Sequence, residues 1–463
     1  MAPMPSKQKR RTVARVKKAI QRKLASSPFL YNIGKNIYVL LRKIYFFPRH
    51  VYYFLTACFV QPVKFKLNPL PLKYGAWYED DIDFSEFKTD IKSIAYYLPQ
   101  FHQIPENDRW WGEGFTEWTN TRKAKPLFKG HYQPREPHSD IGYYDLSDIR
   151  VLKKQAAMAR AHGIHGFCFY HYWFSGKRLL EKPVDLLLEH PEIEIPFCIC
   201  WANENWTRRW DGGDTTILIE QKYDDEDEVA FIKSLEPYLR DPRYIRIEGK
   251  PLITIYHICE IPDPKSWMSV WRDYCRKSGI GEISIYAVYH SAVNHSKKVE
   301  DFGIDGFVEF PPHHCASPFI YNKTYLYDYD TQLRRYVSHE RHPEKCIKSV
   351  MLGWDNTARK GDEALIFNNF NAMKYFMWLK KAITFTRKNF ESNNRFIFIN
   401  AWNEWAEGTY LEPDKKYGYN SLNITSRALF DLPYNYKAED HHDDSVDIKA
   451  EVNCNHHLVE TKA

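Results

Sequence analysis

Eight short apolar runs, separated by stretches of helical periodicity, are the feature of this sequence that most restricts its fold. The runs are nearly continuous Ile, Val, Phe, Tyr and Cys rather than alternating apolar and polar residues. This pattern is typical of strands that are covered on both faces, as in parallel sheets. The runs occupy residues 91–99, 163–173, 196–202, 251–257, 283–290, 306–310, 349–355 and 395–405.

Helical periodicity fills several of the intervals, at residues 145–162, 224–240, 264–278 and 362–388. The second of these segments opens with an acidic cluster, which suits the positive end of a helix dipole. Eight strands interleaved with helices predict an α/β fold, a (β/α)8 barrel of the TIM type with long loops after the strands. A doubly wound open sheet is the alternative. It is less favoured, because no glycine-rich phosphate turn follows the first strand.

Charge divides the chain unevenly. Residues 1–78 contain 16 Lys and Arg and no Asp or Glu, whereas the rest has 49 basic and 59 acidic residues, a net charge of −10. Arg42, Lys43 and Arg49 interrupt the apolar runs of this first segment, so a membrane span would bury charges at a large cost. A signal peptide is disfavoured, because the basic region is too long and no cleavage site follows a clean apolar core.

We therefore predict that residues 1–78 form a basic, aromatic, helical arm that lies on an anionic membrane surface. A solvated or partner-binding arm is the alternative. Nucleic acid is not expected as a partner, because the acidic remainder of the chain would repel it. The predicted location is the cytoplasm, at the inner face of the cell membrane.

Two further parts follow the arm: a barrel over residues 79–432, and an acidic, His-containing tail at 433–463 that is predicted to be disordered. The nine cysteines are an odd number, and several lie in apolar runs, which favours free buried thiols in a reducing cytosol. Cys198 and Cys200 lack a second pair of ligands at a convincing spacing, so they are expected in the core. No metal ion or other cofactor is expected.

Aromatic and polar residues gather at the ends of the predicted strands, where a parallel barrel builds its active site. Trp and Tyr rings stack on sugar faces, and Asn, His and carboxylate groups hydrogen-bond hydroxyls. The candidate substrate-binding residues are Tyr97, Gln100, His102, His171, Tyr172, Trp173, Trp201, Asn203, Glu204, Trp206, Arg208, His257, Glu309, Trp354 and Asn403.

Glycosyl chemistry typically needs two carboxyl groups. Glu404 and Glu407, three residues apart at the end of the last run, are the best candidate pair. Crowding them among aromatic rings is expected to raise the pKa of at least one. Glu204 and Glu309 are the other candidates, and a solvated pair on a helix surface is the alternative interpretation.

Five long motifs carry a resemblance to a known family. The sequence resembles the WbsX-like proteins of bacterial surface-polysaccharide biosynthesis (lipopolysaccharide, O-antigen), often described as glycoside hydrolase family 99-like. The resemblance covers roughly residues 90–415. The motifs are YLPQFH (97–102), WWGEGFTEWT (110–119), GFCFYHYW (166–173), WANENWTRRWD (201–211) and WNEWAEGT (402–409).

The similarity to glycoside hydrolase family 99 itself is more distant and rests on NEWAEGT (403–409), followed by Glu412. That family comprises retaining endo-α-mannosidases with a (β/α)8 barrel, in which the substrate's own 2-hydroxyl forms a 1,2-anhydro sugar. The resemblance implies that Glu404 is the base on the 2-hydroxyl and Glu407 the acid at the leaving oxygen. It also implies a glycan or lipid-linked oligosaccharide with α-mannosyl or α-rhamnosyl linkages as substrate, and no metal.

The reaction itself stays open at this point, because WbsX-like proteins have also been called glycosyltransferases. Asp81-Ile-Asp83 and Asp328-Tyr-Asp330 match a metal–nucleotide pattern, but three-residue patterns arise easily by chance. Arg208 and Arg209 would suit a diphosphate, as in a transferase or a lipid-linked substrate. The hypotheses are hydrolysis or transglycosylation, glycosyl transfer from a nucleotide sugar in the same pathway, and non-catalytic glycan binding.

Overall fold

The computed structural model of the chain describes residues 78–208, 213–223, 226–293, 297–338, 343 and 345–434. The predicted arm, apart from Tyr78, and all but the first two residues of the predicted tail lie outside the described residues. In the part of the chain that is described, no helix is both long enough and apolar enough to cross a membrane.

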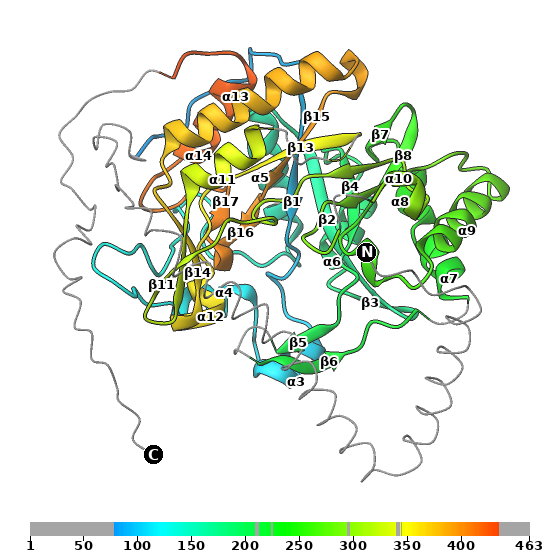
Figure 1. Ribbon diagram of the computed structural model, residues 1–463, viewed down its shortest axis with the longest axis horizontal. Helices are drawn as coiled ribbons and strands as arrows, with labels where there is room; N and C mark the ends of the chain where they lie inside the picture. The colour runs from blue at the N-terminus through cyan, green and yellow to red at the C-terminus, as the bar shows by residue number, and fades with distance from the viewer. Residues whose placement is uncertain are drawn as a thin grey trace, which may run out of the picture. The chain divides into compact units, whose positions relative to one another are not determined.

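Eight parallel strands form a closed barrel (Figure 1). Each strand pairs with the next one along the chain, and the last pairs with the first, so the sheet has no free edge. This confirms the predicted barrel and excludes the open doubly wound sheet. The strands are β1 (Lys92–Tyr97), β2 (Ile164–Phe174), β4 (Phe197–Trp201), β8 (Lys250–Ile255), β9 (Ser284–Val288), β10 (Gly306–Val308), β13 (Cys346–Met351) and β15 (Phe396–Asn400).

Helices between the strands cover the outside of the barrel (Figure 1). Side-chain caps mark several of their starts: Asp148, Asp263 and Asn371 each accept a hydrogen bond from a backbone N–H of the following helix. The main helices are α5 (Ile149–Ala161), α6 (Lys182–Glu189), α7 (Asp227–Ser234), α8 (Glu236–Arg240), α9 (Pro264–Lys277), α11 (Tyr329–Val337), α13 (Ala372–Asn389) and α14 (Asn420–Leu429).

The prediction of a helix over residues 362–388 is wrong for residues 362–371. Residues Leu365–Asn368 form strand β14, which pairs in parallel with β12 (Thr324–Asp328). Asn371 then caps α13, which begins at Ala372. The apolar residues of 365–368 fit a strand as well as a helix, and pairing with a distant segment decides between the two.

Short elements inserted after the barrel strands build up one end of the barrel. Helices α3 (Pro105–Trp111) and α4 (Glu117–Lys123) follow β1, and a hairpin of β5 (Trp206–Arg208) and β6 (Gly213–Ile219) follows β4. Strand β11 (Phe319–Tyr321) joins β12 and β14 in a small sheet, and α12 (Thr357–Lys360) follows β13. Figure 1 shows these insertions together, on the side of the barrel away from α13.

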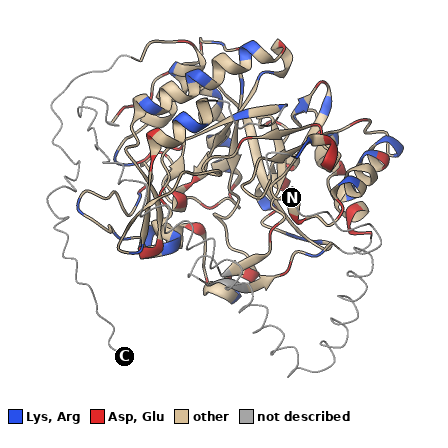
Figure 2. Ribbon diagram, viewed as in Figure 1, with Lys and Arg blue, Asp and Glu red and all other residues tan. Residues whose placement is uncertain are grey.

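Mostly neutral side chains fill the barrel and the space between its strands and the outer helices. Figure 2 shows Lys, Arg, Asp and Glu mainly on outer helices and loops, and few of them on the barrel strands. Cys198 and Cys200 are buried in β4, and no disulfide joins the cysteines that the structure describes. Their burial agrees with their predicted place in the core.

Candidate active site at the carboxyl ends of the barrel strands

A cavity of about 520 Å³ lies at the carboxyl ends of the strands, among the inserted elements. That volume is within the range of small-molecule sites. Its wall combines aromatic rings with a few charged groups, and includes Gln100, Tyr170, Tyr172, Phe174, Glu204, Trp206, Tyr256, His313, Trp354, Arg359, Glu404 and Glu407.

One guanidinium group joins three carboxylates at this cavity. Arg359 of α12 donates from Nη1 to Glu407 Oε1 at 2.5 Å and from Nη2 to Glu404 Oε2 at 3.0 Å. Its Nε donates to Glu117 Oε1 at 2.7 Å, and Glu117 is fully buried on α4. Burial lowers the pKa of Arg359, but attraction to the three carboxylates outweighs it and raises the pKa above its ordinary value. The arginine is therefore a fixed positive charge between the candidate catalytic groups.

The acidity of Glu404 is altered by its surroundings in the cavity wall. Burial raises its pKa to about 8, because desolvation disfavours the charged form. Arg359 opposes this rise, and the negative charges of Glu407 and Glu117 add to it. A carboxyl group of this kind exchanges a proton near neutral pH, which is the property needed for general acid–base catalysis.

Glu412 holds the loop that carries the carboxylate pair. It accepts hydrogen bonds from Trp405 Nε1 at 2.7 Å, Trp402 Nε1 at 3.1 Å, Gln155 Nε2 at 2.6 Å and the hydroxyl of Tyr144 at 2.9 Å. Burial raises its pKa to about 7, which these donors oppose. Since its oxygens are occupied by groups of the core, Glu412 positions the loop rather than facing the cavity.

Aromatic rings and polar groups together line the cavity, and three of the rings, Trp206, Tyr172 and Phe174, form an aromatic wall. The Trp206 ring stacks on Tyr172 with centroids 5.3 Å apart and on Phe174 at 6.1 Å, both at 22°. Gln100 Nε2 donates to the Tyr172 hydroxyl at 3.0 Å and so fixes that ring. Flat apolar faces beside charged groups match the two kinds of surface that a sugar ring presents.

The family model described as "Glycosyltransferase WbsX" matches residues 93–425, which include the whole barrel and all the groups described above. The chain belongs to the WbsX family. WbsX-family relatives include the uncharacterized protein WxcX of two strains of Xanthomonas campestris pv. campestris, 40% identical over 349 residues and 41% over 351. Each alignment covers 73% of this chain and 50% of the relative, so the chain spans about half the length of these relatives.

Solved structures with this architecture include a glycoside hydrolase-like protein, with a TM-score of 0.50 and 15% identity over 76% of this chain and 97% of that one. The GH99 endo-alpha-mannosidase from Bacteroides thetaiotaomicron is also similar, with a TM-score of 0.47 and 16% identity over 74% of this chain and 98% of that one. At these identities the similarity concerns the fold.

The cavity of this WbsX-family chain brings together seven of the residues singled out in the sequence. Both members of the carboxylate pair face it, and the others supply rings and hydrogen-bonding groups to its wall. These seven are Gln100, Tyr172, Glu204, Trp206, Trp354, Glu404 and Glu407.

Strand alternation separates other candidates from the cavity. Along β2, Tyr170, Tyr172 and Phe174 line the cavity, whereas His171 and Trp173 point to the opposite face and are buried. Trp173 Nε1 donates to Asp227 of α7 at 2.9 Å. Burial lowers the pKa of His171 to about 3, so its ring is neutral in the core.

Four more candidates are buried in structural roles. Trp201 packs on Trp271 with centroids 5.8 Å apart. The Tyr97 hydroxyl donates to Gln155 at 2.6 Å. Asn403 bridges the backbone of residue 98, accepting from its N–H at 2.7 Å and donating to its C=O at 3.0 Å. His102 is also buried, and burial lowers the pKa of its ring.

Glu309 lies in a buried ion pair rather than in the cavity wall. Its Oε1 accepts from Lys348 Nζ at 2.5 Å, and Oε2 accepts from the N–H of Ser349 at 3.2 Å. Arg208 belongs to β5, but its side chain lies outside the described part of the structure.

Arg359 and Glu117 are residues of the candidate site that the sequence did not single out. Glu117 lies inside the WWGEGFTEWT motif, which offered a signal. Arg359 lies on a helix of four residues outside every motif noted, and only the fold places it beside the pair.

Neither Asp-x-Asp pattern reaches the cavity wall. Asp328 caps α11 by accepting from the N–H of Thr331 at 2.9 Å, and Asp330 pairs with Lys374 at 3.2 Å. Asp83 accepts from the N–H of Ser85 at 2.9 Å. Each of these carboxylates has a local structural role.

Proposed function

We propose that this WbsX-family protein is a glycan-active enzyme that cleaves or transfers α-mannosyl or α-rhamnosyl linkages, with Glu404 and Glu407 as the catalytic pair. The proposed substrate is a glycan or a lipid-linked oligosaccharide of surface polysaccharide biosynthesis. The observation that carries the proposal is the bridging of both carboxylates by Arg359 in an aromatic-lined cavity. Two carboxyl groups in one cavity are the minimum that glycosyl chemistry of this type requires.

The first step uses the sugar's own 2-hydroxyl. Glu404 takes the proton of that hydroxyl, and O2 attacks C1 from the face opposite the leaving group. The bond from C1 to the leaving oxygen breaks, Glu407 gives its proton to that oxygen, and a 1,2-anhydro sugar forms. Because burial raises the pKa of Glu404 to about 8, its carboxylate is a stronger base than an exposed one.

The second step opens the 1,2-anhydro ring. Glu407 removes the proton of a water or acceptor hydroxyl as that oxygen attacks C1, the C1–O2 bond breaks, and Glu404 returns its proton to O2. Two inversions at C1 give net retention. Water as the nucleophile gives hydrolysis, and a sugar hydroxyl gives transglycosylation. Arg359 keeps both carboxylates in place through the cycle.

Glycosyl transfer from a nucleotide sugar is the second candidate, and the description of the family as a glycosyltransferase favours it. In that reaction the Glu404 and Glu407 pair would act on the acceptor hydroxyl instead of on a glycosidic oxygen. The two candidates differ in whether a nucleotide sugar is required.

A product assay by mass spectrometry tests both. The full chain is incubated with lipid-linked α-mannosyl or α-rhamnosyl oligosaccharides, with and without a panel of nucleotide sugars. Shortened or disproportionated chains without a nucleotide sugar support the leading proposal. Extension only with a nucleotide sugar contradicts it and supports the second candidate.

Substitution of the pair gives the first mutational prediction. Glu404→Gln and Glu407→Gln should each lower kcat at least 100-fold, because general acid–base groups contribute about that much or more. Glu189→Gln, an exposed position on α6, is the matched control and should keep full activity. Activity that survives both substitutions contradicts the proposed site.

A further inference from the structure

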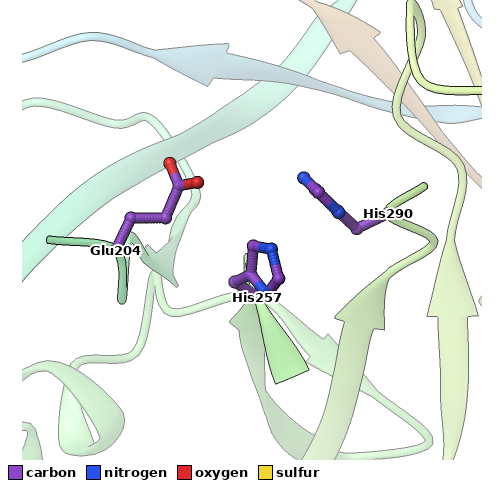
Figure 3. A group of neighbouring side chains, drawn as sticks. All are labelled: Glu204, His257 and His290. Carbon is purple, nitrogen blue, oxygen red and sulfur yellow. The ribbon is translucent and has the colours of Figure 1, made fainter. Parts of the chain in front are cut away.

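Three potential metal ligands meet beside the cavity, at the ends of three adjacent strands. Glu204 follows β4, His257 follows β8, and His290 follows β9, and β8 pairs with both of its neighbours. One ligand atom from each residue lies within 4.8 Å of the other two. Figure 3 shows the carboxylate and the two rings converging on a common space.

His257 is the most constrained of the three. It is only 8% exposed, and its Nδ1 has no hydrogen-bond partner among the described residues. A carboxylate oxygen of Glu260 lies 3.9 Å from this Nδ1, too far for a hydrogen bond. A buried polar atom without a partner is costly and calls for a ligand.

Asn203 fixes His257 from the backbone. Its Oδ1 accepts from the His257 N–H at 2.7 Å, and its Nδ2 donates to the His257 carbonyl at 3.0 Å. The His257 and His290 rings lie 4.1 Å apart between centroids. The two imidazoles are therefore held close together before any ion binds.

We propose that Glu204, His257 and His290 bind one divalent transition-metal ion, such as Zn²⁺, Mn²⁺ or Co²⁺. Two imidazoles and one carboxylate form a recurrent ligand set for such ions, whereas Mg²⁺ and Ca²⁺ prefer oxygen ligands throughout. Ligand distances of about 2.0–2.2 Å require the three ligand atoms to lie roughly 3.0–3.5 Å apart. Ion binding therefore requires the ligand atoms, now within 4.8 Å of one another, to move closer together, and the half-buried side chain of Glu204 is less enclosed than that of His257.

The ring of His290 must adjust for this binding. The N–H of Ala292 donates to its Nδ1 at 3.1 Å, so a neutral ring carries its hydrogen on Nε2. Coordination through Nε2 moves that hydrogen to Nδ1 and breaks the bond from Ala292. The competing interpretation is a hydrogen-bonded cluster of two histidines and a carboxylate that binds no ion.

The proposed ion would border the cavity, because Glu204, Tyr256 and Ser291 all contribute to the cavity wall. Three protein ligands leave coordination positions open, and these take oxygen atoms of a bound molecule. This proposal goes beyond the proposed glycosyl chemistry, which needs no metal.

Direct metal binding is the test. The untagged full chain is stripped with a chelator and titrated with Co²⁺ by visible absorption, and its Zn²⁺ content is measured after dialysis. We expect one ion per chain, and an affinity at least tenfold weaker in Glu204→Gln, His257→Gln and His290→Gln. His190→Gln, at the end of α6, is the control and should bind as the parent does.

A second control removes the histidines of residues 433–463, which are potential ligands of their own. Replacing His441, His442, His456 and His457 by Gln should leave the single site intact. Circular dichroism shows whether each variant folds. If His257→Gln does not fold, the affinities of Glu204→Gln and His290→Gln for the ion decide the test. The proposal is overturned if no ion binds, if the ligand variants bind as tightly as the parent, or if the tail variant alone loses binding.

Discussion

Arg359 is the positively charged residue that links the carboxylates of the candidate site. It pairs with three carboxylates, and two of them, on Glu404 and Glu407, line the cavity. Burial is the main cause of the raised pKa of Glu404; the charge of Arg359 opposes the rise, and the negative charges of Glu407 and Glu117 add to it.

Removing the Arg359 guanidinium should raise the pKa of Glu404 further. In Arg359→Gln we expect kcat/KM at pH 7 to fall at least 100-fold, because the positive charge that lowers the pKa of Glu404 is gone. The pH–activity profile should move to higher pH. Arg150→Gln, an exposed arginine on α5, is the control. An unmoved profile would show that Arg359 has no electrostatic role.

The pH dependence of the unmodified protein tests the role of Glu404. A base must be deprotonated to act, so kcat/KM should rise as the pH increases through about 8, the pKa of Glu404. The measurement is kcat/KM between pH 5 and pH 10 on one substrate. A fall over the same range would instead assign Glu404 as the acid.

At the scale of elements, the site is built from insertions rather than from the barrel strands alone. Glu117 comes from α4, Arg359 from α12 and Trp206 from β5, and each of these short elements follows a different strand. The hairpin of β5 and β6 supplies one ring of the aromatic wall, at Trp206.

Loss of that ring should weaken substrate binding more than turnover. Stacking of one aromatic ring is worth about 1 kcal/mol, so Trp206→Ala should raise KM severalfold to tenfold with a smaller effect on kcat. Steady-state kinetics measures this. Tyr325→Ala, an exposed ring on β12, is the control. An equal rise of KM in Trp206→Ala and Tyr325→Ala would show that the effect comes from general destabilisation of the protein.

Each of the eight predicted runs overlaps one barrel strand, because strands covered on both faces are mostly apolar. The run at 349–355 shares only its first three residues with β13, since the polar Lys348 lies inside that strand. The sequence also indicated the Glu404 and Glu407 pair. The sequence did not show which residues of a run such as 166–173 line the cavity and which lie in the core. Alternate residues of β2 face opposite sides, and side chains on both sides are buried. Arg359 escaped prediction because its partners lie 45 to 242 residues away in the chain.

At the scale of the whole molecule, charge separates residues 1–78 from the acidic remainder. We predict that deleting this segment abolishes sedimentation with vesicles rich in phosphatidylglycerol and leaves the thermal midpoint of the barrel unchanged. Vesicles of phosphatidylcholine are the control, since they lack the negative surface charge that lysines and arginines recognise. Equal sedimentation of both forms with anionic vesicles would disprove membrane attachment through this segment.

Because β1 pairs with β15, the candidate site combines the first and the last parts of the barrel to be synthesised. Asn403 is bonded to the backbone of Leu98, 305 residues earlier in the chain. During synthesis, most of the aromatic wall emerges long before the two glutamates do. A growing chain therefore contains the rings of Tyr172, Phe174 and Trp206 long before it contains Glu404 and Glu407, and the wall of the cavity is complete only when the last strand docks beside the first.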